Sequence, residues 1–332
     1  MTQAGLNSGS GTGLGLGLGL GLGIDAGGSR TRWALAGADG AIVGSGSVDG
    51  MSALQMASEE GRLALQERLT RLCHSVLALG RPARVRAGLT GFDPERHGAQ
   101  FGAWLSVLLA IDVDQIALGT DIDIAYLDSV GPNLDSKLDS NFSPGSGPGY
   151  MVYAGTGSIG AWFDGGGQLQ RAGGRGFLLD DGGGGYWIAR EALRLIWRRE
   201  DECPGSWRTS TLAQAVFEQI GGSDWAASRQ FMYEKQRGDI GMLALAVAAT
   251  FDTDAGSAAI LREAGRELAR LALALSERHG PRPVVLTGRA AGLHPAIFDA
   301  MRAALPFDTI LSRHVAEPHL AAARSAAAVS QR

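Results

Sequence analysis

The spacing of apolar and polar residues near the start of the chain is that of short strands followed by a helix. Three apolar runs separated by turn residues predict a strand meander at about residues 20–25, 31–37 and 41–48. The turn Gly37-Ala38-Asp39-Gly40 is typical of a hairpin between the last two runs. Leucines and valines then recur at helical spacing, which predicts one long helix over about 52–79.

Strands and helices alternate through the rest of the chain, which predicts layered α/β architecture. The remaining expected strands lie at about 85–89, 115–118, 151–154 and 284–286, with a further apolar run after Ser158. The remaining expected helices lie at about 94–110, from 121, and at 186–199, 209–220, 225–237, 239–250, 257–279, 290–304 and from 318. Residues 131–149 are rich in Pro, Gly, Ser and Asn, so we expect a surface loop there.

Composition narrows the classes of protein and partner. The 332 residues, of which 45% are hydrophobic, suffice for one large or two medium domains. Opposite charges are interspersed and the net charge is −4, which disfavours nucleic acid and anionic membranes as partners. Two distant cysteines, Cys73 and Cys203, are no disulfide framework, so we expect a reducing cytoplasm.

Residues 1–22 form a Gly/Leu-rich tail that lacks the basic start and continuous apolar core of a signal peptide. Glycine loses more conformational freedom on ordering than any other residue, so we expect the tip to be disordered. The last Leu-Gly pairs can extend the first strand, because leucine at every second position gives it one apolar face. We assign the repeat no function.

Gly155-Thr156-Gly157-Ser158 is a tight turn between two apolar runs. Such a turn points several backbone N–H groups into one small space, which suits a phosphate oxygen. An ordinary glycine-rich hairpin is the alternative interpretation.

A second stretch has the same layout, because an apolar strand there ends at Asp25 and a turn of small residues follows. Asp25 is placed to hold Mg²⁺, which prefers oxygen ligands and keeps several waters. The turn residues expected to contact phosphate oxygens are Gly27, Gly28, Ser29, Arg30 and Thr31. Neither turn fits a P-loop or a dinucleotide-binding motif. Two such turns about 130 residues apart indicate two related halves that close on one nucleotide.

With these turns, the chain resembles the BadF/BadG/BcrA/BcrD ATPase-like family, which includes N-acetylglucosamine and glucosamine kinases within the sugar kinase/hsp70/actin fold. The resemblance covers roughly residues 22–330. It rests on the motifs GIDAGGSRT, Asp121 in GTDIDIAY, AGTGS, GGRGFLLDDGGGGYWIA and Val284-Val285-Leu286-Thr287-Gly288. The third and fourth of these, in that order, are the specific ones.

The resemblance implies two ribonuclease H-like (actin-like ATPase) domains with a cleft between them and a helical elaboration in the second. After the 1–22 tail, it implies an N-terminal domain over 23–120 and a C-terminal domain over 121–317. A last helix over 318–330 is expected to pack back on the first domain.

The family places its catalytic Asp at Asp121, after an Asn that Thr120 replaces here. A carboxylate within hydrogen-bond reach of a sugar hydroxyl can accept its proton as the phosphoryl group transfers. The alternative is that Asp121 merely caps a helix, where a carboxylate stabilises the N-terminal dipole. Asp123 ranks well below Asp121 as a base.

The resemblance also implies binding residues. Gly288 is expected to let an adenosine approach the backbone, and Gly155 to Ser158 to bind phosphate. The residues implied to line the sugar site are Ser52, Thr90, Gly174 and Asp181. Four departures from the related kinases bear on which sugar binds, namely Ala53, Arg175, Asp180 and Gly182 in place of Asn, Trp, Gly and Glu.

The implied activity is transfer of the ATP γ-phosphate to a hydroxyl, expected to be O6, of N-acetylglucosamine or a related amino sugar, with Mg²⁺. The implied state is a cytoplasmic homodimer. One alternative is an ATPase module acting on a protein partner, although such relatives carry paired cysteines for an iron–sulfur cluster and the spacing of Cys73 and Cys203 is different. The other is a non-catalytic sugar sensor on the same fold.

Overall fold

The computed structural model describes residues 19–28, 30–131 and 149–328 and contains two five-stranded sheets. The first sheet has the order β3-β2-β1-β4-β5. Strands β1 to β3 form an antiparallel meander, whereas β4 and β5 run parallel to β1. Its strands are β1 (Gly21–Ala26), β2 (Arg30–Ala36), β3 (Ile42–Asp49), β4 (Arg84–Leu89) and β5 (Ile116–Thr120).

The second sheet repeats this arrangement with the order β8-β7-β6-β9-β10. Strands β6 to β8 are antiparallel, and β9 and β10 run parallel to β6. Its strands are β6 (Tyr150–Ala154), β7 (Ser158–Phe163), β8 (Leu169–Gly173), β9 (Val284–Thr287) and β10 (Leu311–Arg313). The sequence pattern did not predict β8 and β10, because both are short and largely polar.

The first half carries its helices between and beside the strands of its sheet. They are η1 (Ala53–Ala57), α1 (Glu59–Leu77), α2 (Pro94–Leu109), η2 (Val113–Gln115) and α3 (Asp121–Ser129). The single helix expected over 52–79 is divided, because the backbone of Ser58 is extended. Its side chain accepts a hydrogen bond from Gly61 N and so starts α1 afresh. Apolar faces of α1 and α2 pack on the first sheet.

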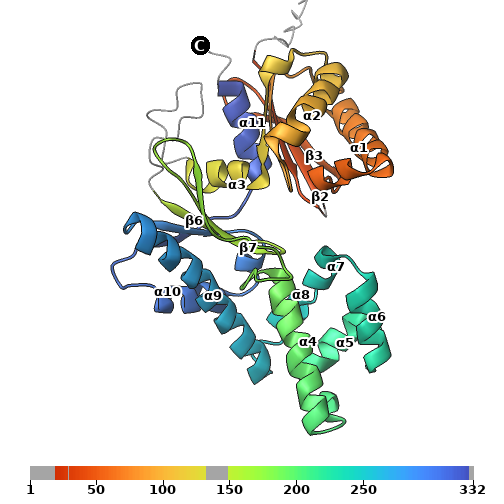
Figure 1. Ribbon diagram of the computed structural model, residues 1–332, viewed down its shortest axis with the longest axis vertical. Coiled ribbons are helices and arrows are strands. Elements are labelled where there is room, and N and C mark those ends of the chain that lie inside the picture. The colour runs from red at the N-terminus through yellow and green to blue at the C-terminus, as the bar shows by residue number, and fades with distance from the viewer. Residues whose placement is uncertain (1–18, 29, 132–148, 329–332) are drawn as a thin grey trace, which may run out of the picture.

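The second half contains a helical subdomain beside its sheet (Figure 1). The helices of the second half are α4 (Gly185–Glu202), η4 (Ser206–Thr209), α5 (Thr211–Ile220), α6 (Trp225–Glu234), α7 (Arg237–Gly241), α8 (Ala244–Ala249), α9 (Ala255–His279), η5 (Ala290–Gly292) and α10 (Pro295–Ala304). The helices expected over 239–250 and 290–304 are each divided into two shorter ones. Helix α9 packs on β6, β7 and β8 and also on α10.

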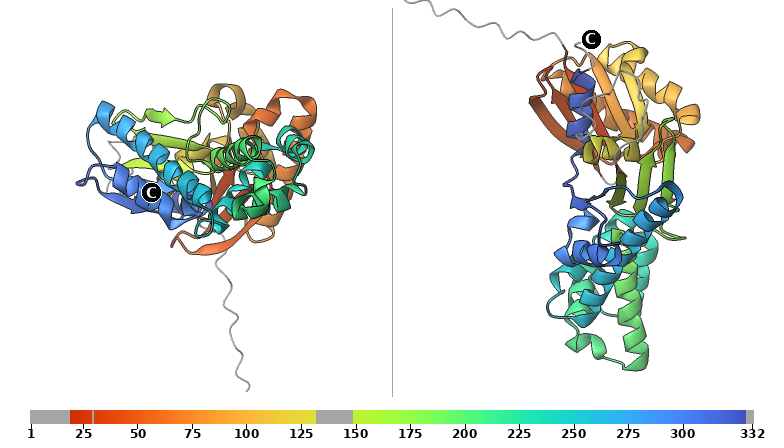
Figure 2. Two further views of the ribbon diagram at one scale, coloured as in Figure 1. Left: turned by 90° about the horizontal axis from the view of Figure 1, so that it is seen from below. Right: turned by 90° about the vertical axis from the view of Figure 1, so that its left-hand side faces the viewer.

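The last helix, α11 (Pro318–Ala328), lies on the first sheet although it comes from the end of the chain (Figure 2). A Cβ at Gly21 or Gly23 of β1 would overlap the backbone of α11. Leu22 and Ile24, which alternate with these glycines, are fully buried in the main core of the first half. The end of the Gly/Leu repeat therefore has a structural reason, since glycine lets the helix backbone approach the strand. Strand β1 begins two residues before the expected domain boundary, and residues 1–18 of the expected tail lie outside the described residues.

Helix α3 lies between the two sheets and contacts α11, β4 and β5 on one side and β6 and β7 on the other (Figure 1). Asp128 of α3 accepts hydrogen bonds from His314 Nε2 at 2.9 Å and from Glu317 N at 2.8 Å. Those two residues belong to the segment that leads from β10 to α11. The chain crosses between the halves after α3 and again before α11, and these hydrogen bonds join the two crossing segments. Of the loop expected over 131–149, residues 132–148 lie outside the described residues.

Candidate functional site

The carboxyl ends of β1, β4 and β5 meet at one edge of the first sheet. Register pairs Ala26 with Leu89 and Leu89 with Thr120, so Asp25, Thr90 and Asp121 come from neighbouring strand ends. Ligands of open α/β sheets bind at such an edge. Three of the residues expected at the site are therefore brought together by strand pairing alone.

Asp121 is held by a short hydrogen bond. Thr90 Oγ1 donates to Asp121 Oδ2 at 2.6 Å. Burial raises the pKa of the Asp121 carboxyl, while the bond from Thr90 opposes that shift because it favours the charged form. A half-buried carboxylate with a raised pKa and a fixed orientation is suited to accept a proton.

Thr120, rather than Asp121, is the N-cap of α3. Its hydroxyl accepts from Asp123 N at 3.3 Å, and Asp123 Oδ2 accepts from Thr120 N at 2.6 Å, which completes a capping box. The N-cap position itself is therefore filled by Thr120, while the Asp121 carboxyl also interacts with the first backbone N–H groups of α3, those of Asp121 and Ile122, which lower its pKa. Asp121 occupies the first turn with its carboxyl directed to Thr90.

Ser52 links the loop after β3 to the end of β4. Its hydroxyl donates to Thr90 O at 3.1 Å and accepts from Leu54 N at 3.3 Å. Ala53 N donates to the same carbonyl at 3.0 Å. Ser52 therefore lies at the expected sugar-site edge and holds the residue that orients Asp121.

Asp25 lies beside this group. Its Oδ2 is 3.5 Å from Arg32 Nη2 of β2, the residue directly opposite in the strand pair. Burial raises the pKa of Asp25 to about 6, Arg32 opposes the shift, and the charge of Asp121 adds to it. No set of three metal-ligating side chains comes together within the described residues. One carboxylate beside a phosphate site fits Mg²⁺ held with waters and nucleotide oxygens.

The turn between β1 and β2 closes through a hydrogen bond from Gly27 N to Arg30 O at 3.2 Å. Gly28 is exposed, and among the described residues a Cβ there would have no atom within 4 Å. Arg30 is exposed as well, whereas Ser29 lies outside the described residues. The open side of this turn can admit a phosphate oxygen.

Thr31 differs from the expectation that it contacts phosphate. It is fully buried, and its hydroxyl accepts a hydrogen bond from Met51 N at 3.0 Å. Thr31 therefore anchors the loop that carries Ser52. Its burial follows from the alternation of β2, which turns this side chain into the core.

The second turn, between β6 and β7, packs on the glycine cluster that begins α4. Gly155 O accepts from Gly185 N at 2.8 Å and Thr156 O accepts from Tyr186 N at 2.9 Å. A Cβ at Gly184 would lie 2.7 Å from the carbonyl carbon of Gly157. The cluster is needed because the two backbones touch.

Within the second turn, Gly155 N donates to Gly157 O at 2.9 Å. Ser158 is buried, and its hydroxyl donates to Gly182 O at 2.7 Å. Neither group is therefore directed to a ligand, although both were expected to contact phosphate. Within the described residues, Thr156 N and Gly157 N have no such partner, so they remain as the donors of this turn.

Asp181 also differs from the expectation that it contacts sugar hydroxyls. It is buried with a left-handed backbone (φ 59°), and its Oδ1 accepts from Gly176 N at 3.2 Å. Burial raises the pKa of its carboxyl. Packed against Gly157, Asp181 supports the second turn from behind. The left-handed backbone and the burial both depend on long-range packing, so no local pattern predicts them.

Gly174 and Gly288 lie close to the second turn. Gly174 has a positive φ of 62°, and its N–H donates to Ser158 O at 3.1 Å. Gly288 follows β9 with a φ of 98°, and a Cβ there would overlap Ala154 O. Both glycines are explained by their positive φ, and Gly288 also by the close approach of the Ala154 backbone.

Charges connect the strand ends of the two halves. The charges of Asp25 and Asp121 both raise the pKa of Tyr153 on β6, and the charge of Arg289 after Gly288 lowers the pKa of Asp25 and of Tyr153. Tyr153 and Arg289 therefore lie near the carboxylates of the first half. Tyr153 lies within an apolar run, so no local pattern in the sequence marks it as a site residue.

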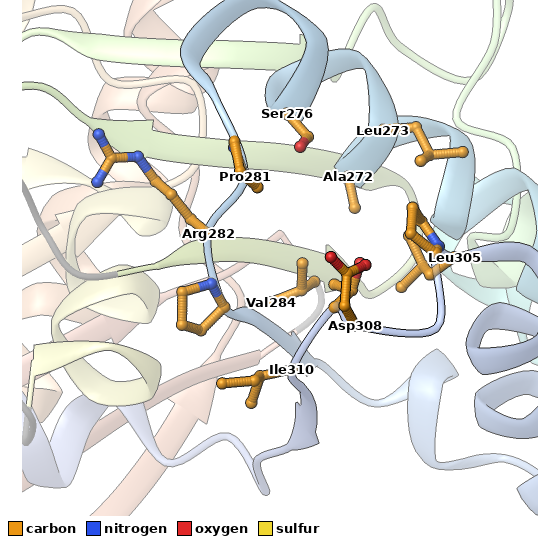
Figure 3. Close-up of a pocket in the computed structure, with 12 residues that line it drawn as sticks. Ala272, Leu273, Ser276, Pro281, Arg282, Val284, Leu305, Asp308 and Ile310 are labelled. Carbon is orange, nitrogen blue, oxygen red and sulfur yellow. The ribbon is translucent and has the colours of Figure 1, made fainter.

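A separate cavity of about 190 Å³ lies at the other end of the second sheet (Figure 3). Val284 at the start of β9 and Ile310 just before β10 line it with Ser276 and Asp308, and the Arg282 guanidinium points away from it. It is therefore remote from the strand ends that carry Thr287 and Gly288. None of the site residues contributes to it.

Residues 140–305 match the model of the BadF/BadG/BcrA/BcrD ATPase family. The chain belongs to this family. The resemblance carried by its motifs is thus confirmed. Comparison with curated proteins gives no match. No helix in the described ranges combines the length and apolar content needed to span a bilayer.

Three solved structures show what this family member is similar to in fold. A candidate N-acetylglucosamine kinase from Chromobacterium violaceum is 23% identical with a TM-score of 0.64, over 95% of this chain and 99% of that one. Another from Porphyromonas gingivalis is 18% identical with a TM-score of 0.69, over 91% and 96%. A ROK family glucokinase from Streptomyces griseus, in complex with glucose and AMPPNP, is 14% identical with a TM-score of 0.55, over 94% and 99%. The expected two-domain actin-like ATPase fold is thus confirmed.

Proposed function

We propose that this protein is an ATP-dependent sugar kinase that binds its substrates between the two sheets. The observation that carries the proposal is the hydrogen bond of 2.6 Å from Thr90 to Asp121. It directs a half-buried carboxylate to the edge where Asp25 and the open turn at Gly28 also lie. A base, a phosphate site and a charged partner for a cation are the parts that phosphoryl transfer requires.

In the proposed reaction, the acceptor hydroxyl of the sugar hydrogen-bonds to Asp121. The oxygen of the sugar hydroxyl forms a bond to the γ-phosphorus, while the bond from that phosphorus to the oxygen that bridges to the β-phosphate breaks. The hydroxyl proton passes to Asp121, and ADP leaves. Amides of the two turns stabilise the charge on the transferring group, and both are fixed before the reaction.

Asp25 would hold Mg²⁺, with Arg32 on its other side. When bound, Mg²⁺ neutralises charge on the nucleotide phosphates. In the free protein, Arg32 instead supplies the positive charge near Asp25.

We infer an amino sugar as the acceptor, N-acetylglucosamine or a close relative, phosphorylated at O6. Support comes from the family and from two structural neighbours described as candidate N-acetylglucosamine kinases. Arg175 is exposed and Ala53 is buried in the core of the first half, at positions where the family pattern has a Trp and an Asn. A hydrogen-bonding site rejects analogues that lack its partner groups, so Arg175 bears more directly than Ala53 on which amino sugar is preferred.

We also propose that the protein is a cytoplasmic homodimer. The two cysteines are free thiols, with Cys73 buried and Cys203 exposed, which suits a reducing compartment.

An ADP-release assay over amino sugars and plain hexoses tests the function. Sugar-dependent ADP release is expected. ADP release at the same rate with and without sugar would favour an ATPase module acting on a protein. Sugar binding without ADP release would favour a sensor.

A further inference from the structure

Tyr153 belongs to the second half of the molecule, and its side chain faces the first half. Directly paired residues of neighbouring antiparallel strands point to the same face of a sheet, and so do alternate residues of one strand. Tyr153 pairs with Ile159 of β7, which shares its face with Phe163. Phe163 makes an edge-on contact with Tyr126 of α3, with ring centroids 5.0 Å apart. Tyr153 therefore lies on the side of β6 that faces α3 and the first sheet.

The ring of Tyr153 lies over the start of the second turn. A Cβ at Gly155 would be 2.8 Å from Tyr153 Cε1 and 3.4 Å from its Oη. This explains why residue 155 is glycine and places the hydroxyl beside the turn. Tyr153 is half-buried, and within the described residues its Oη has no hydrogen-bond partner. The hydroxyl is therefore available to a ligand.

Charges from the other half act on the same hydroxyl. Burial and then the charges of Asp25 and Asp121 raise the pKa of Tyr153 to about 12, against the charges of Arg289 and Arg32. The hydroxyl stays protonated at all ordinary pH values, so it is a hydrogen-bond donor. It lies beside the second turn, whose Thr156 and Gly157 amides have no backbone partner within the described residues, and near the carboxylates of the first half.

We propose that Tyr153 is a further active-site residue whose hydroxyl donates a hydrogen bond to the γ-phosphoryl group. This inference rests on the proposed binding of ATP between the two turns. In the transfer, Tyr153 keeps its proton, since the acceptor proton goes to Asp121. The hydroxyl adds a third donor to the two amides of the second turn. It contacts the γ-phosphoryl group, which ADP lacks, so we do not expect it to contribute to ADP binding.

Tyr153→Phe tests this, because it removes the hydroxyl and keeps the ring. Calorimetry with Mg-AMPPNP and with Mg-ADP needs no sugar. Loss of a hydrogen bond to a charged group weakens binding by about 10- to 100-fold, so we expect AMPPNP to bind at least about tenfold more weakly and ADP nearly as before. In turnover with the best sugar, we expect kcat to fall by about 10²- to 10³-fold.

Tyr150→Phe is the matched control on the same strand. The Tyr150 hydroxyl lies on the opposite face, where it donates to Gly280 O at 2.6 Å. We expect this variant to lose stability while both nucleotides bind as in the wild type. Equal AMPPNP affinity of Tyr153→Phe and the wild type would overturn the inference. If the wild type binds AMPPNP but phosphorylates no sugar, the kinase proposal fails while the binding comparison still decides the part played by Tyr153. If it binds neither nucleotide, both fail.

Discussion

Two aspartates at one strand end, Asp121 and Asp123, have different parts. Thr120 and Asp123 cap α3, which leaves the Asp121 carboxyl to the hydroxyl of Thr90. A local motif accounts for the cap, since the two residues three apart exchange hydrogen bonds. Separating the cap from the base makes the part of Asp121 testable by substitution.

Asp121→Asn is expected to lower kcat by about 10²- to 10⁴-fold, because general-base catalysis contributes about that much. ATP affinity should be nearly unchanged. Since burial raises the pKa of Asp121, wild-type kcat should also fall on the acid side as the base becomes protonated. Steady-state kinetics across pH checks both.

Asp123→Asn is the control, because its amide oxygen can still accept from Thr120 N. We expect unchanged turnover and a loss of stability, because the Asn keeps the cap but no longer opposes the charge of Arg86. Near-normal turnover of Asp121→Asn would show that Asp121 is not the base.

Asp25 should reduce the stability of the free protein at neutral pH. Its pKa is about 6 in the folded state against 3.8 ordinarily, so above pH 6 the folded state carries a buried charge that it disfavours. A shift of two units corresponds to about 3 kcal/mol. Asp25→Asn is therefore expected to be more stable than the wild type by up to about 3 kcal/mol at pH 8. The difference should shrink as pH falls through 6 and nearly vanish by about pH 4.

Urea unfolding at several pH values measures this difference. A stability gain that does not change with pH would contradict the assignment of the titrating group to Asp25. In calorimetry, the same variant should lose most of the Mg²⁺-dependent gain in ATP affinity.

At the scale of elements, the two strand–turn–strand units were predictable and their supports were not. Glycines and small polar residues between apolar runs marked both turns in the sequence. Thr31 is buried where its hydroxyl accepts from Met51 N, and Asp181 is buried against Gly157. Both contacts join residues that are distant in sequence. Tyr153 was missed for a related reason, because a four-residue apolar run does not reveal which of its alternate positions faces a cleft.

Gly28→Ala tests the first turn. In the described part of the chain, the added methyl would meet no atom within 4 Å, so it would take up open space at the turn proposed to bind a phosphate. We expect a stability change within about 0.5 kcal/mol and an ATP affinity lower by about tenfold or more. Gly166→Ala, in the exposed turn between β7 and β8, is the matched control and should change neither. Normal ATP binding by Gly28→Ala would place the phosphates elsewhere.

At the scale of the whole molecule, two sheets of the same topology lie on either side of α3. The strand orders β3-β2-β1-β4-β5 and β8-β7-β6-β9-β10 are equivalent element by element. The sequence predicted two related halves from two similar turns. It did not predict β8 or β10, which complete the second sheet, because strands of five and three largely polar residues leave little pattern.

The central claim is that the two halves together transfer a phosphoryl group from ATP to a sugar. The most direct test is to incubate the protein with Mg-ATP and each of a series of amino sugars and hexoses, and to identify the products by phosphorus NMR and mass spectrometry. We expect one amino sugar to give a sugar monophosphate, with one ADP formed for each, and Asp121→Asn to abolish most of it. ADP formed together with free phosphate at a rate independent of every sugar, or no ADP at all, would contradict the account.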